Sequence, residues 1–527
     1  VILMTGLKMV GMALFSLLCG ALAARCASVA GMGFGCEVRK AVFNHIQDFS
    51  FGNIDKFSTA SLITRLTTDI NMVQMTFMMA IRMFVRSPFM FIAAIYYALK
   101  VNARLSMVFL VVIPIMIVFI AVFATTALPR FQAMFKKYDK FNASIQENLI
   151  AIRVVKAYVR SKYEKEKFNA SNDDLKQASI YAEKIMTLTS PLMMLMMFSS
   201  TIAVLWFGSR LIFGGNMEIG QLSSFISYIS QILVSLMMIS AIFVMTVISK
   251  ASLTRICEVL DEEPTISDKD ADKDLLVKDG SVEFKNVSFK YKSGTGNNVL
   301  DKINLSIRSG ETIGIIGATG SSKTTLVQLI PRLYDATEGE VLVGGRPVKS
   351  YTLDHLRNAV SMVLQKNVLF SGSIEDNLRW GNENATEDEI KEACRIAQAD
   401  EFIMSFPDGY KTDLGQGGVN VSGGQKQRLC IARALLKKPK ILILDDSTSA
   451  VDTATDQKIR DGFKNKIGDT TTIIIAQRIH SVESADRIIV LDDGKINAVG
   501  THDELLLSNK IYKEVYASQQ EGSVVNE

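Results

Sequence analysis

The sequence predicts a multi-domain chain in which an all-α membrane domain is fused to an α/β domain with a buried parallel sheet. Long apolar stretches fill the part before residue 251, and alternating strand-like and helix-like segments follow residue 280. The charge divides at the same place: residues 1–250 hold 24 Lys and Arg against 12 Asp and Glu, and the remainder holds 34 against 42. This composition excludes a disordered chain, a small disulfide scaffold and a uniformly basic nucleic-acid binder.

Five stretches are long enough to cross a bilayer, which needs about 20 largely apolar residues. They are Val1 to Ala24, Asn71 to Leu99, Leu105 to Pro129, Thr187 to Ser209 and Ile219 to Ser249. The connecting segments 25–69 and 130–184 hold five and twelve Lys and Arg, so the positive-inside rule places both in the cytoplasm. Five spans before a cytoplasmic C-terminal domain put Val1 outside, and we therefore expect a further span to precede it.

The spans are rich in methionine, as at Met193, Met194, Met196, Met197, Met237 and Met238. Such side chains suit an adaptable cavity for varied apolar ligands, and they suit surfaces that face lipid or neighbouring helices equally well. Arg82 and Arg86 lie inside one span, where snorkelling toward the inner headgroups is favoured over a role in a substrate path.

A charged segment without apolar runs separates the two halves. We predict a transmembrane domain over residues 1–257, a linker over 258–280 and the α/β domain over 281–527. Strands are expected at 281–291, 311–316, 440–445 and 471–476, where apolar and β-branched residues cluster. The six Cys form no CxxC pair and the four His are scattered, so we expect reduced thiols and no protein metal cage.

The chemistry begins at the loop from Gly317 to Thr325, between a strand-like segment and a helix-like one at 326–333. Backbone N–H groups of such a loop cradle phosphates, a lysine reaches the terminal phosphate oxygens and a hydroxyl suits Mg²⁺. The loop residues expected to contact nucleotide are Gly317, Thr319, Gly320, Ser321, Ser322, Lys323, Thr324 and Thr325. The pattern G-x-x-x-x-G-K-[ST] requires Gly where this chain has Ser322, and a side chain there strains a tight turn.

Two further motifs accompany this loop. Residues 441–446 form an apolar strand that ends in two acids: Asp445 is placed to hold Mg²⁺ through water, and Asp446 stands where a general base belongs. Upstream, residues 421–428 contain Ser-Gly-Gly-Gln. A purely structural role for Ser-Gly-Gly-Gln, as a Gly-rich loop that caps a helix, does not explain why it lies between a phosphate loop and a strand that ends in two acids.

Together these motifs resemble the ATP-binding cassette (ABC) exporter family over essentially the whole chain, as a half-transporter with a P-loop NTPase nucleotide-binding domain. The resemblance implies that two chains, each with six spans, enclose ATP between their cassettes and switch from inward-facing to outward-facing. It implies that Tyr291 stacks on adenine and that Gln365 senses Mg²⁺ beside Thr324 and Asp445. It also implies that the cytoplasmic turns near 53–57 and 158–167 are coupling helices, which rest on the nucleotide-binding domains. It also implies a signature sequence that closes on the partner's ATP, Ser422, Gly423, Gly424 and Gln425, and a loop joining the two sites that contains Asp452.

Two residues depart from the family pattern. The family usually has Glu where this chain has Asp446, one methylene shorter, and His where it has Gln477, which cannot carry charge. A misplaced base can cost about 10²-fold or more in rate. These residues and Ser322 act on the ATP of this chain's own loop, whereas the intact signature acts on the partner's. The departures resemble those in the degenerate half of bacterial heterodimeric multidrug exporters.

We therefore expect a heterodimer subunit in the bacterial cell membrane, with a cytoplasmic cassette and a slow ATP site, that exports hydrophobic or amphipathic drug-like compounds. Its expected partners are a different half-transporter, membrane lipid and a hydrophobic small molecule, with ATP and Mg²⁺ as cofactors and no nucleic acid. A lipid or peptide flippase of the same architecture remains open, as does an ATP-gated regulatory or channel-like subunit. The five spans exclude a DNA-repair ATPase, and the fused domains disfavour an importer.

Overall fold

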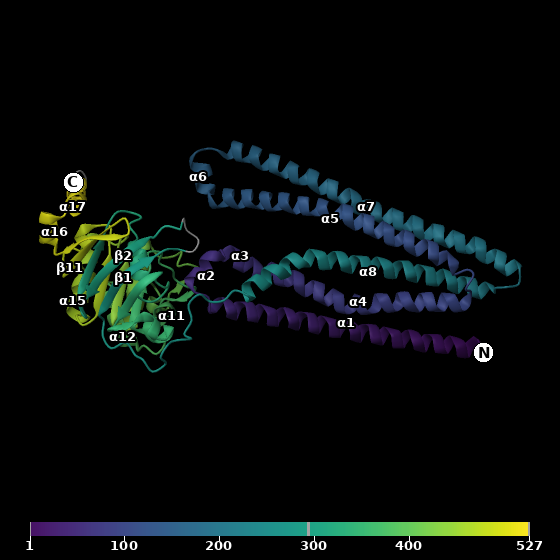
Figure 1. Cartoon of the computed structure of the whole chain (residues 1–527), viewed down its shortest axis with the longest axis horizontal. Helices are drawn as coiled ribbons and strands as arrows, with labels where there is room; N and C mark the ends of the chain where they lie inside the picture. Colours follow the sequence, from purple (N-terminus) through teal and green to yellow (C-terminus); the bar gives the residue numbers. More distant parts are fainter. Residues whose placement is uncertain (1, 292–295, 525–527) are drawn as a thin grey trace. The chain divides into compact units, whose positions relative to one another are not determined.

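The computed structural model describes residues 2–291 and 296–524, and the chain forms two compact units (Figure 1). Unit 1 comprises Val1–Ile46 and Ala60–Asp261, and unit 2 comprises Gln47–Thr59 and Glu262–Glu527. The predicted fold class is confirmed, because a helical unit is fused to an α/β unit. The division differs from the expected one at residue 257: the last long helix continues to Leu260, and residues 47–59 group with the α/β unit.

Unit 1 is built from long helices joined by short connections. Its helices are α1 (Ile2–Gln47), α3 (Thr59–Thr64), the π-helical turn η1 (Arg65–Asp69), α4 (Ile70–Val101), α5 (Met107–Ile150), α6 (Ile152–Ala157), α7 (Ser161–Phe213) and α8 (Ile219–Leu260). Five helical segments of the described chain are long and apolar enough to cross a membrane, as predicted. The 53 residues of α7 extend over about 80 Å at 1.5 Å per residue, well beyond the hydrocarbon core.

Helix α4 packs on α8, and α5 packs on α7, which also contacts α8. Figure 1 shows α5 and α7 running side by side up to α6. In the core of this unit the rings of Phe109 and Phe225 stack with their centres 5.2 Å apart. The hydroxyl of Ser235 donates to the carbonyl of Gln231, 2.7 Å away in the same helix, so this polar group is satisfied in an apolar setting.

The turn expected at residues 158–167 is shorter than predicted, and its coupling role stays a prediction. The short helix is α6, which ends at Ala157, and α7 has already begun at Ser161. The chain reverses at Val159, whose φ of 55° is incompatible with a continuing right-handed helix.

Unit 2 contains a six-stranded sheet in the order β12-β11-β3-β10-β9-β6. The strands are β12 (Lys495–Gly500), β11 (Arg487–Asp492), β3 (Thr312–Ile316), β10 (Thr471–Ile475), β9 (Ile441–Asp445) and β6 (Val360–Val363). All neighbours are parallel except β12, which pairs antiparallel with β11 at the edge. The predicted strands are confirmed to within two residues, because runs of Ile, Leu and Val fill the buried interior.

A second, antiparallel sheet has the order β2-β1-β4-β5. Its strands are β2 (Leu300–Ile307), β1 (Val282–Phe289), β4 (Glu338–Val343) and β5 (Arg346–Pro347). Side chains of both sheets, such as Phe284 and Ile313, form one continuous core. This core fixes the strands from which the phosphate loop emerges.

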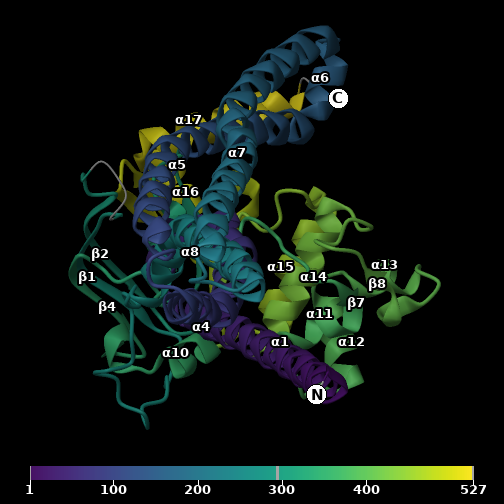
Figure 2. The same cartoon turned by 90° about the vertical axis from the view of Figure 1, so that its right-hand side faces the viewer.

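Helices surround these sheets, and α11 to α14 gather in one part of unit 2 (Figure 2). The remaining elements of unit 2 are α2 (Phe51–Lys56), α9 (Lys323–Gln328), η2 (Val348–Ser350), α10 (Leu353–Ala359), β7 (Gly372–Ser373), α11 (Ile374–Arg379), α12 (Glu387–Ile396), α13 (Asp400–Met404), η3 (Gly409–Lys411), β8 (Asp413–Leu414), α14 (Gly423–Leu436), α15 (Thr453–Lys466), η4 (Ile479–Ser481), α16 (His502–Ser508) and α17 (Lys510–Val524). The helix predicted at 326–333 is instead α9, which ends at Gln328. A left-handed residue, Arg332 at φ 52°, follows it and turns the chain.

Candidate functional site

The predicted nucleotide residues gather at one edge of the six-stranded sheet. Strands β3, β10, β9 and β6 are neighbours and run parallel, so the chain leaves all four at the same edge. The phosphate loop follows β3, Gln477 follows β10, Asp446 follows β9 and Gln365 follows β6. Segments up to 160 residues apart in sequence thus meet at one place because of strand order alone.

The phosphate loop is closed by its lysine. Lys323 Nζ donates to the carbonyl oxygens of Gly317 and Ala318 at 2.8 and 2.9 Å, and burial lowers the pKa of this lysine. A Cβ at Gly317 would lie 2.2 Å from the Leu491 carbonyl oxygen, and Gly320 adopts a φ of 88°. Both glycines are therefore required by the backbone path, while Thr319 is exposed on the outside of the loop.

Ser322 occupies the left-handed region, with φ 71° and ψ 23°. This conformation costs a residue with a Cβ roughly 1–2 kcal/mol, and glycine adopts it freely. The departure from the phosphate-loop pattern therefore falls on a position where the turn favours glycine.

The oxygen atoms beside the loop fit Mg²⁺. Thr324 Oγ1 donates to Asp445 Oδ1 at 3.1 Å, whereas Asp445 Oδ2 is buried without a hydrogen-bond partner in the described chain. Burial raises the pKa of Asp445, and the hydrogen bond from Thr324 and the charge of Lys323 oppose that rise. Hydroxyl, carboxylate and amide oxygens are the ligands that Mg²⁺ prefers, and Thr324, Asp445 and Gln365 would supply one of each.

The two residues that depart from the family pattern contact each other. Gln477 Nε2 donates to Asp446 Oδ2 at 2.9 Å. Burial raises the pKa of Asp446, and the amides of Gln365 and Gln477 oppose that rise by hydrogen bonding to the carboxylate. The candidate base is therefore hydrogen-bonded to a neutral side chain.

Tyr291 connects an aromatic cluster to the phosphate loop. Its hydroxyl lies 3.0 Å from Thr325 Oγ1. Its ring meets those of Phe289 and Tyr334 edge-on, with centres 4.9 and 5.3 Å away. The expected adenine-stacking residue is thus half-buried and fixed on one side.

The signature sequence forms the beginning of α14. Ser422 Oγ accepts from Gln425 N–H at 3.3 Å, and Gln425 Oε1 accepts from Ser422 N–H at 2.9 Å, which is a complete capping box. Gly424 lies so close to the loop 449–452 that a Cβ would be 2.7 Å from the Ala450 carbonyl oxygen. Within the described chain, no hydrogen bond joins the signature to the phosphate loop.

The loop 449–452 is attached to α14 by a residue that the sequence did not single out. Gln427 Oε1 accepts from Ala450 N–H at 3.0 Å, and Gln427 Nε2 donates to Ser449 Oγ at 3.2 Å. At the other end of the loop, Asp452 caps α15 by accepting from Thr455 N–H at 2.9 Å. The signature and this loop therefore form one firmly connected piece.

A second contact absent from the sequence prediction lies within unit 2. Tyr334 Oη donates to Asp55 Oδ2 of α2 at 2.7 Å, and Asn53 Nδ2 donates to Glu262 Oε1 at 2.9 Å. The residues joined by the first bond are 279 positions apart. No local sequence signal links them.

Known proteins share this arrangement. The ABC transporter transmembrane region family matches residues 2–237, and the ABC transporter family matches residues 300–449. The uncharacterized ABC transporter ATP-binding protein YfiB of Bacillus subtilis is 40% identical over 526 residues, which cover 98% of this chain and 90% of the relative. The probable multidrug resistance ABC transporter ATP-binding/permease protein YheI of the same organism is 33% identical, over 92% of this chain and 82% of the relative. The structure of a bacterial Atm1-family ABC exporter with ATP bound superposes with a TM-score of 0.81 at 24% identity, covering 93% of this chain and 86% of that chain.

Proposed function

This chain belongs to the ABC transporter family, and from that premise we propose that it is one subunit of a heterodimeric exporter whose own ATP site hydrolyses slowly. Its membrane and ATP-binding domains are fused in one polypeptide, as in ABC exporter half-transporters. The observation that carries the proposal is the hydrogen bond from Gln477 Nε2 to Asp446 Oδ2.

This bond disfavours fast hydrolysis at the chain's own phosphate loop. A general base must reach the proton of the attacking water, and geometry decides whether it can. Asp446 is one methylene shorter than Glu, and one of its oxygens is taken by the Gln477 amide. Gln477 itself has no titratable proton and cannot stabilise charge as a protonated His does. Mg²⁺, when bound, neutralises charge on the phosphate oxygens, and Thr324, Asp445 and Gln365 are the residues that would hold it.

The other half of the ATP machinery in this chain is intact. The capping box of Ser422 and Gln425 fixes the beginning of α14, and the N-terminus of such a helix suits a phosphate of the partner's ATP. The proposal therefore assigns two unequal roles: this chain retains ATP at its own loop and completes an active site whose loop and base belong to a different subunit.

The proposed cargo is hydrophobic or amphipathic. The relative YheI, 33% identical and named a probable multidrug resistance transporter, supports a drug-like class of compounds. The apolar, methionine-rich segment Pro191–Phe213 of α7 and the apolar helix α8 are compatible with such compounds.

The test measures ATP hydrolysis by the purified chain alone and after restoring both family residues, with Asp446→Glu and Gln477→His. We expect the chain alone to be slow and the double variant to hydrolyse ATP at least tenfold faster, because base and charge stabilisation return together. Asp461→Glu serves as the matched control and should leave the rate unchanged, since it lengthens an exposed acid of α15 that lies outside the ATP-binding motifs. Fast hydrolysis by the unmodified chain, unaffected by Gln477→Ala, would contradict the proposal.

A further inference from the structure

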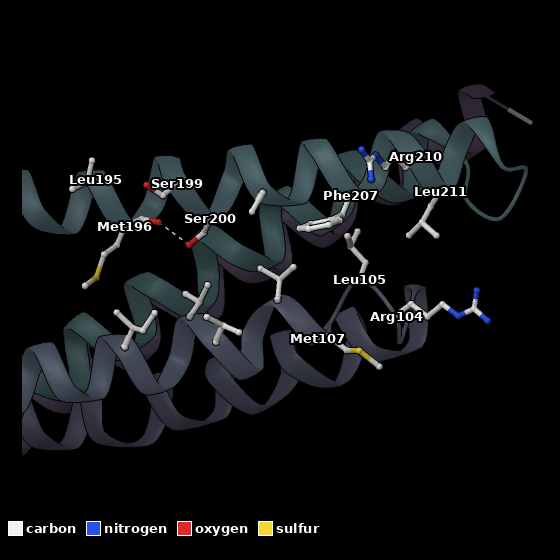
Figure 3. Close-up of a pocket in the computed structure, with 15 residues that line it drawn as sticks. Arg104, Leu105, Met107, Leu195, Met196, Ser199, Ser200, Phe207, Arg210 and Leu211 are labelled. Atoms are coloured by element: carbon white, nitrogen blue, oxygen red, sulfur yellow. Dashed lines mark hydrogen bonds between the residues drawn. The ribbon is translucent and has the colours of Figure 1, made fainter.

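Unit 1 contains a cavity of about 820 Å³ between the first turns of α5 and the last turns of α7 (Figure 3). Its α5 wall is aliphatic and includes Val108, Val111 and Ile115. On the α7 side the Ser200 hydroxyl donates to the Met196 carbonyl oxygen at 2.6 Å, so it offers little to a ligand. The volume lies within the range of small-molecule sites, about 300–1,000 Å³.

Two arginines stand at one end of this apolar space. Arg104 comes from the α4–α5 connection and Arg210 from the last turn of α7, and Figure 3 shows both at the same end of the cavity. The Arg210 guanidinium lies 5.1 Å from the centre of the Trp206 ring. Within the described chain neither arginine forms an ion pair, and no Asp or Glu lines the cavity. The positive charge is therefore uncompensated.

The membrane topology of the chain places the arginine end of the cavity on the outer side, because the ATP-binding domain that follows α8 is cytoplasmic. Helix α8 leads directly into that cytoplasmic domain, so its beginning at Ile219 lies on the outer side. The α7–α8 connection is thus external, and α5, which antiparallel packing joins to α7, also begins there. The cavity runs from the outer interface toward the membrane interior, since Leu195 and Arg210 are 15 residues, or about 22 Å, apart along α7.

We propose that this cavity binds an anionic amphiphile, with its phosphate or carboxylate head between Arg104 and Arg210 and its apolar chain along the aliphatic wall. The inference rests on the proposed exporter function and specifies the charge of its substrate. Guanidinium groups pair with phosphate and carboxylate in bidentate geometry. Arginines that only snorkel to the headgroups need no shared cavity, whereas these two line the same end of a single apolar space (Figure 3).

The test is an equilibrium binding titration with the full-length chain in nanodiscs of zwitterionic lipid. The probes are fluorescent lysophosphatidylglycerol, which is anionic, and fluorescent lysophosphatidylcholine with the same acyl chain, which is zwitterionic. We expect the anionic probe to bind more tightly and its affinity to fall with ionic strength. The double change Arg104→Gln and Arg210→Gln should weaken the anionic probe about tenfold and leave the zwitterionic probe unchanged.

Lys100→Gln is the matched control, because Lys100 is also external but lies over the Tyr96 ring and does not line the cavity. It should leave both affinities unchanged. Ala203→Leu fills the cavity from α7 and should weaken both probes while ATP binding is retained. Equal affinity for the two probes, or an arginine effect no larger than that of Lys100→Gln, would overturn the inference. If the double change Arg104→Gln and Arg210→Gln disrupted the association of the subunits but left the binding of both probes unchanged, that result would also overturn the inference.

The binding readout separates this inference from the proposed function. If the anionic probe binds as expected but no ATP-dependent transport of it follows in vesicles that contain both subunits, the exporter function fails and the site stands. If a hydrophobic cation is exported while the anionic probe does not bind, the exporter function stands and the site fails.

Discussion

Ser322 places a side chain at a phosphate-loop position where the backbone favours glycine. Its φ of 71° follows from the turn that brings Lys323 back to the Gly317 carbonyl. The sequence pattern alone predicted strain at this residue, because the glycine of the motif has a known conformational purpose. At this residue the sequence motif alone was enough to predict the backbone conformation.

The strain predicts the effect of Ser322→Gly. We expect the free energy of unfolding to rise by about 1 kcal/mol, and ATP to bind more tightly because the loop closes without strain. Thermal unfolding and nucleotide titration measure the two effects.

Asp493→Gly is the control for this prediction. Asp493 also has a positive φ, 44°, but lies in the exposed β11–β12 turn. It should stabilise the chain without changing the affinity for ATP. Unchanged stability and affinity in Ser322→Gly would show that the serine fits the turn at no cost.

The bond between Gln477 and Asp446 could not be predicted in the same way. The sequence showed two separate departures from a pattern. Their contact depends on β9 and β10 being neighbours, with Ile475 opposite Asp445. Strand order is a property of the whole sheet, and no window of sequence around either residue contains it.

At the scale of elements, the cap of α14 has both a structural and a functional role. Ser422→Ala removes the side chain that accepts from Gln425 N–H. We expect a stability loss of about 1 kcal/mol and, in the heterodimer, a several-fold loss of ATP hydrolysis at the partner's site. Thermal unfolding and steady-state ATPase rates of the complex measure these effects.

Thr501→Ala provides the matched comparison, because Thr501 caps α16 with the same kind of capping box, formed with Glu504. Thr501→Ala should lower the free energy of unfolding by a similar amount and leave the rate of ATP hydrolysis unchanged. Equal losses of activity in the two variants would mean that Ser422 acts through stability alone.

Element boundaries were predictable where apolar runs were long. The isoleucines of β9 and β10 are buried on both faces, and this pattern identified both strands. The errors at 158–167 and 326–333 have a common cause. Val159 and Arg332 turn the chain with positive φ, and a β-branched or long side chain gives no warning of such a turn.

At the scale of the whole molecule, Tyr334 stands between the ATP site and α2. Its ring meets Tyr291 edge-on, and its hydroxyl bonds to Asp55. We expect Tyr334→Phe to retain ATP binding but to reduce substrate-stimulated ATP hydrolysis several-fold, since α2 loses its hydrogen bond to this aromatic cluster. ATP affinity and the ratio of stimulated to basal ATPase measure the two quantities.

Tyr351→Phe is the control at this scale. Tyr351 also donates its hydroxyl, to the Val343 carbonyl oxygen at 2.8 Å, but it lies in the buried core of unit 2. It should lower stability by about 1 kcal/mol and leave the stimulated ATPase ratio unchanged. A normal ratio in Tyr334→Phe would exclude a coupling role for this hydroxyl.

The grouping of residues 47–59 with unit 2 bears on how the protein can be divided experimentally. An ATP-binding domain expressed from Glu262 onward would lack Asn53 and Asp55, the partners of Glu262 and Tyr334. Its surface there would lose the hydrogen bonds that Asn53 and Asp55 form with Glu262 and Tyr334, and the Tyr334 ring would no longer be covered by α2. Antibodies or inhibitors selected on that fragment would recognise a face that the intact polypeptide keeps covered with its own chain.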